Sequence, residues 1–327
     1  MTKTALVFAD VHVDKNNRPE DTLAVLRQIM QYAVKNKVDF VYVLGDVYER
    51  KRPYSCEKTI FEKFVKYLSD KDIEVIIIPG NHDAEPDGNS AVDEFGILEL
   101  PSVSLKSNPC IVTLGKYKVW LGHMLVQGAK LGPIDFQASS PVSLQSIFNA
   151  WDASIYLLGD VHKAQKLNEN PPVLYVGSPE RQDFGERDEK KGFTLLTATD
   201  EKLEYKFIPL DIRPMIQFDL EYAKLEDWLN DSGDYEKGQS TTEAIVKVKI
   251  TCNREEYSKI NEKAIKEHLK EAKNVTIEYD IIKTTRVRSK KIKESSSPVK
   301  AFEAYAKLNE FDQETINLGL QIMKETK

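Results

Sequence analysis

The sequence contains few cysteines, and they lie far apart. Cys56, Cys110 and Cys252 are the three cysteines of the 327-residue chain, and no two of them have the C-x-x-C spacing. This pattern argues against both a disulfide framework and a zinc ribbon. It fits a protein of the reducing cytoplasm.

Long hydrophobic segments are also missing. The longest apolar runs, such as residues 75–79, are far shorter than the ~18 residues that span a bilayer, so no membrane role is expected. Near the N-terminus the apolar stretch Ala5–Ala9 stops at Asp10, which makes it too short for the hydrophobic region of a signal peptide. Export is therefore not expected.

The sequence also lacks an excess of basic residues. The formal net charge is −6, with 41% hydrophobic and 30% charged residues, as in soluble globular proteins. This balance argues against a surface coated in positive charge, but it leaves open a local basic patch or bound cations that supply positive charge themselves. The length allows roughly two domains.

Histidine is scarce, and its placement is uneven. Five short apolar runs read as buried strands that end in Asp, Asn or His: Thr4–His12, Asp39–Val47, Ile73–Asp83, Tyr117–His123 and Ser154–His162. Four of the five histidines fall at these ends. A single histidine at the end of a strand is most simply interpreted as a residue held by hydrogen bonds. Four of them, each beside Gly, Asp or Asn, favour a metal site. The fifth, His268, is interpreted as an ordinary helix residue.

Helical patterns separate the first three strands. Residues 22–36 and 58–68 carry apolar side chains at helical spacing. Strand–helix alternation predicts a sheet with helices packed against it, in which the carboxyl ends of the strands gather on one rim. Because the strands are apolar on both faces, they are expected to be buried in a sandwich or beneath helices.

The polar strand ends offer carboxylate, imidazole and amide-oxygen ligands. The candidates are Asp10, His12, Asp46, Asn81, His82, His123, Asp160 and His162. This mixture suits Mn²⁺, Fe²⁺ or Zn²⁺, whereas calcium prefers all-oxygen sites and structural zinc prefers thiolates. The set is too large for one ion. Two ions ~3.5–4 Å apart that share a carboxylate would use it, as in phosphoester hydrolases.

Five motifs carry a family resemblance. DVH (10–12), GDV (45–47), GNHD (80–83), GH (122–123) and GDVH (159–162) resemble, in order, the motifs of the calcineurin-like metallophosphoesterases. Within that family, RKRPYS (50–55) and YVGSPERQDFGERDEKKGF (175–193) are similar to the SbcD branch of double-strand-break repair nucleases. A charged surface hairpin is the alternative interpretation of the second stretch.

The resemblance implies a ligand set for two cations. One cation would take Asp10, His12, Asp46 and His162, and the other would take Asp46, Asn81, His123 and Asp160. Asp46 would bridge the two. Asp160 stands where the family usually has histidine, and its added charge favours harder ions such as Mn²⁺ or Mg²⁺.

Other residues are expected to act on the substrate. By resemblance, His82 would stabilise the transition state or donate a proton to the leaving 3′ oxygen, with Asp83 holding its ring; a structural role in its loop is the alternative. Glu49 stands where some relatives place a second histidine, so help from that position stays open. Substrate-binding candidates are Arg52, Ser178 and Arg181.

The sequence divides into four parts. Residues 1–212 are predicted to form an α/β (α+β) metallophosphoesterase domain, a central β-sandwich flanked by helices. Residues 213–283 read as a small α+β domain with a helix at 255–273, which by resemblance caps the site and positions DNA. Residues 284–297 read as a basic flexible linker, and 298–327 as a helix-loop-helix. The basic run 283–293 would contact DNA phosphates or remain a solvated linker.

The resemblance also implies partners. The two C-terminal helices are too short to bury their apolar side chains unaided. By resemblance they would bind the coiled coil of an SbcC-like ABC-type ATPase; docking on the chain's own capping domain is the alternative. The implied function is that of a Mn²⁺-dependent DNA nuclease, a 3′-to-5′ exonuclease on duplex ends and an endonuclease on single strands and hairpins, acting as a homodimer within a repair and recombination complex. A small-nucleotide phosphodiesterase and a weakly catalytic DNA-end scaffold are the alternatives.

Overall fold

The structure is a computed structural model that describes residues 1–85, 87–97, 100–130, 141–230, 240–282, 297–309 and 311–325. Two compact units account for the chain. Unit 1 comprises Met1–Phe218, Asp231–Val248 and Ala264–Thr276, and unit 2 comprises Asp219–Asn230, Lys249–Lys263 and Ile277–Lys327. None of the described helices combines the length and apolarity needed to span a membrane.

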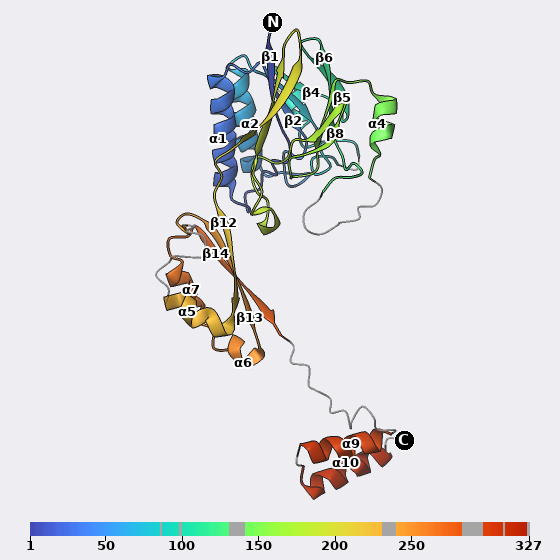
Figure 1. The fold of residues 1–327 in the computed structure, drawn as a ribbon, viewed down its shortest axis with the longest axis vertical. Coiled ribbons are helices and arrows are strands. Elements are labelled where there is room, and N and C mark those ends of the chain that lie inside the picture. The colour runs from blue at the N-terminus through green and yellow to red at the C-terminus, as the bar shows by residue number, and fades with distance from the viewer. Residues whose placement is uncertain are drawn as a thin grey trace. The chain divides into compact units, whose positions relative to one another are not determined.

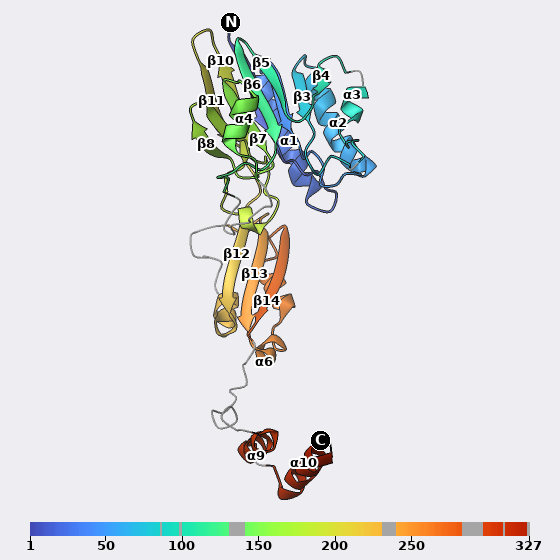
Figure 2. The same ribbon diagram turned by 90° about the vertical axis from the view of Figure 1, so that its right-hand side faces the viewer.

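Two sheets form the frame of unit 1 (Figures 1 and 2). The six-stranded sheet has the order β11-β10-β1-β2-β3-β4, and the five-stranded sheet has the order β5-β6-β7-β9-β8. The first contains β1 (Lys3–Phe8), β2 (Phe40–Leu44), β3 (Glu74–Ile78), β4 (Val103–Leu105), β10 (Gly192–Ala198) and β11 (Leu203–Pro209). The second contains β5 (Cys110–Leu114), β6 (Tyr117–His123), β7 (Ile155–Gly159), β8 (Gln165–Glu169) and β9 (Pro172–Tyr175).

Alternate residues of each strand build separate layers of core. On β1, Leu6 and Phe8 pack with α1 (Pro19–Lys35) and α2 (Ser55–Ser69) in one buried cluster, whereas Ala5 and Val7 face the five-stranded sheet in another. Trp120 and Tyr156, on the outer face of the five-stranded sheet, pack with Ile147 of α4 (Leu144–Ala150). The result is a β-sandwich with helices on its outer faces, as the sequence predicts.

Strand direction brings the polar motifs to one rim. β1 pairs with β2, and β2 with β3, in parallel. In the other sheet β6 and β7 are also parallel, and β6 runs to His123 while β7 ends at Gly159. Because parallel strands end at the same edge, the loops that follow them are neighbours.

The remaining strands form a separate three-stranded sheet. Its order is β12-β13-β14, with β12 at Met215–Glu221, β13 at Ile245–Cys252 and β14 at Asn274–Ile281. The helices along this stretch are α5 (Leu225–Asn230), α6 (Arg254–Tyr257) and α7 (Glu262–His268), the last containing His268 as expected. The single helix predicted for residues 255–273 is therefore wrong. Asn253 caps the start of α6 through the Glu256 amide. The helix ends at Tyr257, before Ser258, a residue type whose side chain competes with helical hydrogen bonds.

Two helices close the described chain (α9 and α10, Figure 1). α9 (Pro298–Leu308) begins after Ser297, and α10 (Gln313–Glu325) is capped by Asp312, whose carboxylate accepts a 2.8 Å hydrogen bond from the Thr315 amide. The expected helix pair is thus present. Leu318 of α10 is 59% exposed. Residues 283–296, which include the basic run, lie outside the described residues.

Candidate metal centre

The loops after β1 and β2 run alongside each other. The Asp10 amide donates to the Gly45 carbonyl at 3.0 Å, and the His12 amide donates to the Asp46 carbonyl at 3.0 Å. These backbone hydrogen bonds bring the motifs DVH and GDV into register. Their side chains therefore face a shared space rather than separate surfaces.

Four of the candidate ligands have a left-handed backbone. The φ angle is 55° at Asp10, 47° at His12, 50° at Asp46 and 90° at Asp160. Non-glycine residues avoid this region, at a cost of ~1–3 kcal/mol each, unless the surrounding structure imposes it. Such strain concentrates at functional sites, and here it turns consecutive strand ends towards one point.

Asp46 lies at the middle of the cluster. Its Oδ2 is 3.2 Å from His123 Nε2 and 3.7 Å from His12 Nε2, while its Oδ1 accepts a 2.8 Å hydrogen bond from the His82 amide. The residue is 3% exposed. Gly80 makes this packing feasible, because a Cβ at that position would overlap the Asp46 carboxylate and amide.

Three histidines are each oriented through Nδ1. His123 Nδ1 lies 2.6 Å from the Leu44 carbonyl oxygen, and His162 Nδ1 lies 2.7 Å from Glu186 Oε1. His12 Nδ1 lies 2.9 Å from Glu49 Oε2, close enough for an ion pair although not aligned as a hydrogen bond. A partner on Nδ1 fixes the ring and its tautomer and leaves Nε2 as a ligand, the arrangement found behind metal-bound histidines.

Asn81, Asp10 and Asp160 complete the cluster. Asn81 Oδ1 is 3.0 Å and Asp160 Oδ1 is 3.8 Å from His123 Nε2. The Asp160 amide donates to Asp10 Oδ1 at 3.1 Å. All seven residues expected to hold cations are thus brought together in the structure; their assignment as ligands stays a prediction.

Three subsets of side chains have the spacing of a metal site. They are Asp10 with His12 and His162, Asp10 with Asp46 and His123, and His12 with Glu49 and His82, with ligand atoms within 4.8 Å of one another in each. The first subset falls within the ligand set expected for one cation, whereas the second combines Asp46 and His123 of the other expected set with Asp10. Asp46 connects them through its contact with His12.

Two buried polar atoms of the cluster indicate whether the site suits a cation. Asp10 Oδ2 and His12 Nε2 are buried, and neither has a hydrogen-bond partner among the described residues. A buried carboxylate oxygen and imidazole nitrogen left without partners are costly, and a divalent cation would satisfy both. The residues present therefore fit the metal ions that such a donor set implies.

Carboxylates dominate the electrostatics of this cluster. Burial lowers the pKa of His123, but the Asp46 and Asp10 carboxylates outweigh it, so the pKa lies well above its ordinary value. Burial together with the nearby Asp10 and Asp46 carboxylates raises the pKa of Asp160. The carboxylates thus draw protons towards the cluster when nothing else compensates them.

His82 and Asp83 differ from expectation in their contacts. His82 Nδ1 lies 2.9 Å from the Glu49 carbonyl oxygen, and its ring packs edge-to-face on His12 with centroids 4.9 Å apart. The buried Asp83 carboxylate instead accepts hydrogen bonds from the Val47, Tyr48 and Gly80 amides. The expectation that Asp83 holds the His82 ring is therefore wrong: Asp83 ties the loop after β3 to the loop after β2, and the Glu49 carbonyl orients His82.

The three substrate-binding candidates lie in different settings. Arg52 is exposed and pairs with Glu85 at 3.0 Å. Ser178 is buried and donates to the Glu180 carbonyl at 2.7 Å, and Arg181 donates to the Glu189 and Arg213 carbonyls. Their role towards substrate stays a prediction.

Two residues behind His162 were not foreseen. Glu186 holds the His162 ring, and Lys191, 2% exposed, donates to the His162 carbonyl at 2.9 Å and lies 2.8 Å from Glu186 Oε2. Both lie in the stretch 175–193 that carries the branch resemblance, but its charges read equally well as a surface hairpin. The sequence shows only the spacing of Glu186 and Lys191, E-x₄-K, and the role of this spacing depends on the packing.

One family model and two known proteins are similar in sequence to this chain. The calcineurin-like phosphoesterase family model matches residues 3–152. A Staphylococcus saprophyticus protein named as the SbcD subunit of the nuclease SbcCD is 21% identical over 262 residues, covering 64% of this chain and 67% of that protein. An uncharacterized protein of Acanthamoeba polyphaga mimivirus is 24% identical over 220 residues, covering 55% of this chain and only 16% of that protein.

Solved structures are similar at low identity. A dimetal phosphatase from Danio rerio has a TM-score of 0.42 at 9% identity, covering 63% of this chain and 96% of that one. A single mutant of Vps29 from Entamoeba histolytica has a TM-score of 0.37 at 16% identity, covering 64% and 99%. The part of the chain that matches the calcineurin-like phosphoesterase family model, residues 3–152, contains five of the seven candidate ligands, which indicates a metal-dependent phosphoesterase: Asp10, His12, Asp46, Asn81 and His123.

Proposed function

We propose that the chain is a DNA nuclease subunit that hydrolyses phosphodiester bonds with two divalent cations, Mn²⁺ foremost and Mg²⁺ as the alternative. The observation that carries this proposal is the position of Asp46 Oδ2, 3.2 Å from His123 Nε2 and 3.7 Å from His12 Nε2. One carboxylate between two imidazoles from different sheets is the geometry that a shared ligand of two cations requires.

The ligand assignment follows from this centre. Asp10, His12, Asp46 and His162 would hold one cation, and Asp46, Asn81, His123 and Asp160 the other. Bound cations would supply Lewis-acid polarisation of the phosphoester and lower the pKa of water. The chain positions these donors through contacts at Nδ1, which Glu49, Leu44 and Glu186 provide to the three imidazoles.

His82 is the proposed proton donor to the leaving 3′ oxygen. Because a carbonyl oxygen only accepts, the contact with Glu49 requires a proton on Nδ1, so His82 would donate from Nε2 as the doubly protonated imidazolium and would be left as the neutral Nδ1–H tautomer. The side chain is partly exposed beside the cluster, and Asp46 holds its backbone amide. A general acid needs this combination of fixed ring and solvent-side nitrogen.

DNA and an ATPase are the proposed partners. The staphylococcal relative is named as a subunit of the nuclease SbcCD, and residues 298–327 would bind an SbcC-like ABC-type ATPase in a cytoplasmic repair complex that contains two copies of the chain. The exposed Leu318 on α10 supports a docking surface there. Residues 213–283 would position DNA, as 3′-to-5′ exonuclease and single-strand or hairpin endonuclease action requires.

Substrate comparison tests the proposal. The purified chain with Mn²⁺ should shorten 5′-labelled strands of a duplex from their 3′ ends and open hairpins. His82→Ala should lose most cleavage and keep Mn²⁺ binding, whereas His268→Ala, a histidine of α7, should retain both. Cleavage of cyclic nucleotides with oligonucleotides left intact would identify a small-nucleotide phosphodiesterase instead, and DNA-end binding that is unaffected by His82→Ala and unaccompanied by cleavage would identify a scaffold.

A further inference from the structure

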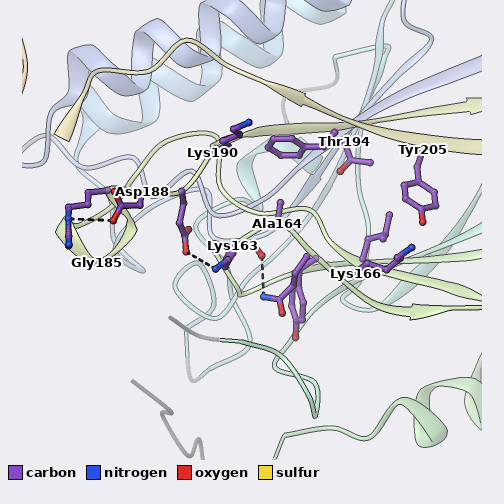
Figure 3. Close-up of a pocket in the computed structure, with 14 residues that line it drawn as sticks. Lys163, Ala164, Lys166, Gly185, Asp188, Lys190, Thr194 and Tyr205 are labelled. Carbon is purple, nitrogen blue, oxygen red and sulfur yellow. Dashed lines mark hydrogen bonds and ion pairs between the residues drawn. The ribbon is translucent and has the colours of Figure 1, made fainter. Parts of the chain in front are cut away.

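A large cavity lies in unit 1, apart from the cluster of strand-end ligands (Figure 3). Its volume is about 930 Å³, within the range of pockets that bind small organic ligands. Its walls include Tyr205 and Phe207 of β11, Leu174 of β9 and Thr194 of β10. Neither the ligand set nor the proposed mechanism uses these residues.

The sheet order explains why the sandwich opens here. β11 is the outer strand of the six-stranded sheet, and β8 is the outer strand of the five-stranded sheet. Along β11, Tyr205 and Phe207 are partly buried, while Glu204 and Lys206 between and beside them are exposed. Two aromatic side chains therefore face a space that no further described strand fills.

The rim of the cavity carries an excess of cations. Lys163, Lys166, Arg187 and Lys190 line it together with the acidic pair Asp188 and Glu189. Lys163 lies 3.9 Å from Glu189, and Arg187 lies 3.6 Å from Asp188. Lys190 makes no ion pair with any residue that the structure describes. Figure 3 shows Lys163 and Lys190 on the same side of the cavity as Asp188, and Tyr205 beside Lys166.

Two chain segments that line the cavity continue into the metal centre. Lys163 directly follows His162, and Gly185 directly precedes Glu186, the residue that holds the His162 ring at 2.7 Å. Lys191 connects the metal centre to the cavity, because its ammonium donates to the His162 carbonyl and to the carboxylate of Glu189, which lines the cavity. A ligand in the cavity would therefore lie next to the segment that carries one of the proposed cation ligands.

We propose that this cavity binds one unpaired nucleotide of the nucleic-acid strand whose phosphodiester occupies the metal centre. The base stacks on Tyr205 and Phe207, and the phosphate is held by Lys190 and Lys163. Aromatic faces beside basic side chains are the combination by which proteins bind single strands without sequence preference. A purely apolar ligand would leave Lys190 without an ion-pair partner among the residues that the structure describes. The inference rests on the proposed function, because it names the strand that the nuclease would hold.

Binding of deoxyadenosine 5′-monophosphate in EDTA tests the stacking part. Without divalent cations, binding at the metal centre is removed and the cavity is measured alone by calorimetry. Tyr205→Ala should weaken binding about 5- to 150-fold, the range for loss of one base–aromatic stack, while Tyr205→Phe should bind like the wild type. Equal affinity of the alanine variant and the wild type would overturn the proposal.

A charge reversal supplies a second test that leaves the core untouched. Lys190→Glu should weaken nucleotide binding and reduce its salt dependence. The matched control is Lys206→Glu, which makes the same change at an exposed position of β11. If both variants bind equally well, or if the wild-type chain binds no nucleotide at millimolar concentration, the proposal fails.

The two proposals fail separately. Hydrolysis of a small chromogenic phosphodiester by the wild-type chain with Mn²⁺ measures the activity of the metal centre independently of the cavity, because that substrate has no nucleobase. Hydrolysis without nucleotide binding in EDTA would remove the cavity proposal only. Nucleotide binding without any hydrolysis would contradict the nuclease and leave the cavity as a nucleotide site.

Discussion

Replacing Glu186 by glutamine removes one charge behind a proposed metal ligand. Glu186 Oε1 lies 2.7 Å from His162 Nδ1, and Oε2 lies 2.8 Å from the ammonium of Lys191. Glutamine keeps an oxygen for the imidazole but loses the charge that strengthens it as a ligand and that pairs with the buried lysine. Changes of this kind lower metal affinity about 10- to 100-fold, or ~1.4–2.7 kcal/mol.

Calorimetric titration with Mn²⁺ measures this effect directly. Glu186→Gln should weaken the binding of one of two cations and leave the other close to the wild type, because only His162 depends on this carboxylate. Asp188→Asn is the matched control, since it removes the same charge from a neighbouring side chain that is 88% exposed. If both variants bind Mn²⁺ as tightly as the wild type, the reasoning that links the orienting carboxylate to the metal centre is refuted.

Three further substitutions have defined outcomes. Gly80→Ala should destabilise the fold by ~1–3 kcal/mol and abolish metal binding, because the added methyl group overlaps the Asp46 carboxylate. Gly96→Ala is the control, since a methyl group there makes only ordinary contacts and should preserve binding. Thermal unfolding with and without Mn²⁺ measures both the stability and the metal binding of each variant. Asp160→His should shift preference from Mg²⁺ towards Zn²⁺ in competition titrations, and unchanged preference would argue against its being a ligand. Burial raises the pKa of Asp39, but hydrogen bonds from the ammonium at the start of β1 and from a backbone amide keep it below its ordinary value. Its contribution to stability is present above the unfolded pKa of ~3.9 and is lost as pH falls through the folded value. The stability difference from Asp39→Asn should therefore shrink in acid denaturation below about pH 4, and a constant difference would contradict this.

Much of the fold was predictable, because local patterns dictate it. Apolar strands and amphipathic helices define the layers, and the strand ends at Asp10, Asp46 and His123 gather wherever parallel strands finish together. The predicted helix at 255–273 failed because the chain leaves the helix after Tyr257, where the Ser258 hydroxyl donates to the Glu255 carbonyl, a local competition that hydrophobic spacing does not reveal.

Contacts between distant loops were not predictable from sequence. Nothing in the order of residues indicates that Asp83 turns away from its neighbour His82 to bind amides of another loop, or that the Glu49 carbonyl takes its place. Lys191 reads as one charge among many in a charged stretch, and only packing shows it buried beneath His162. The cavity beside β11 likewise depends on which strands end each sheet, and therefore on topology rather than on pattern.

The most direct test of the central claim is anomalous diffraction from crystals grown with Mn²⁺. Two manganese ions ~3.5–4 Å apart, both within bonding distance of the Asp46 carboxylate, are the predicted result. A single ion, or two ions that share no carboxylate, would contradict the account.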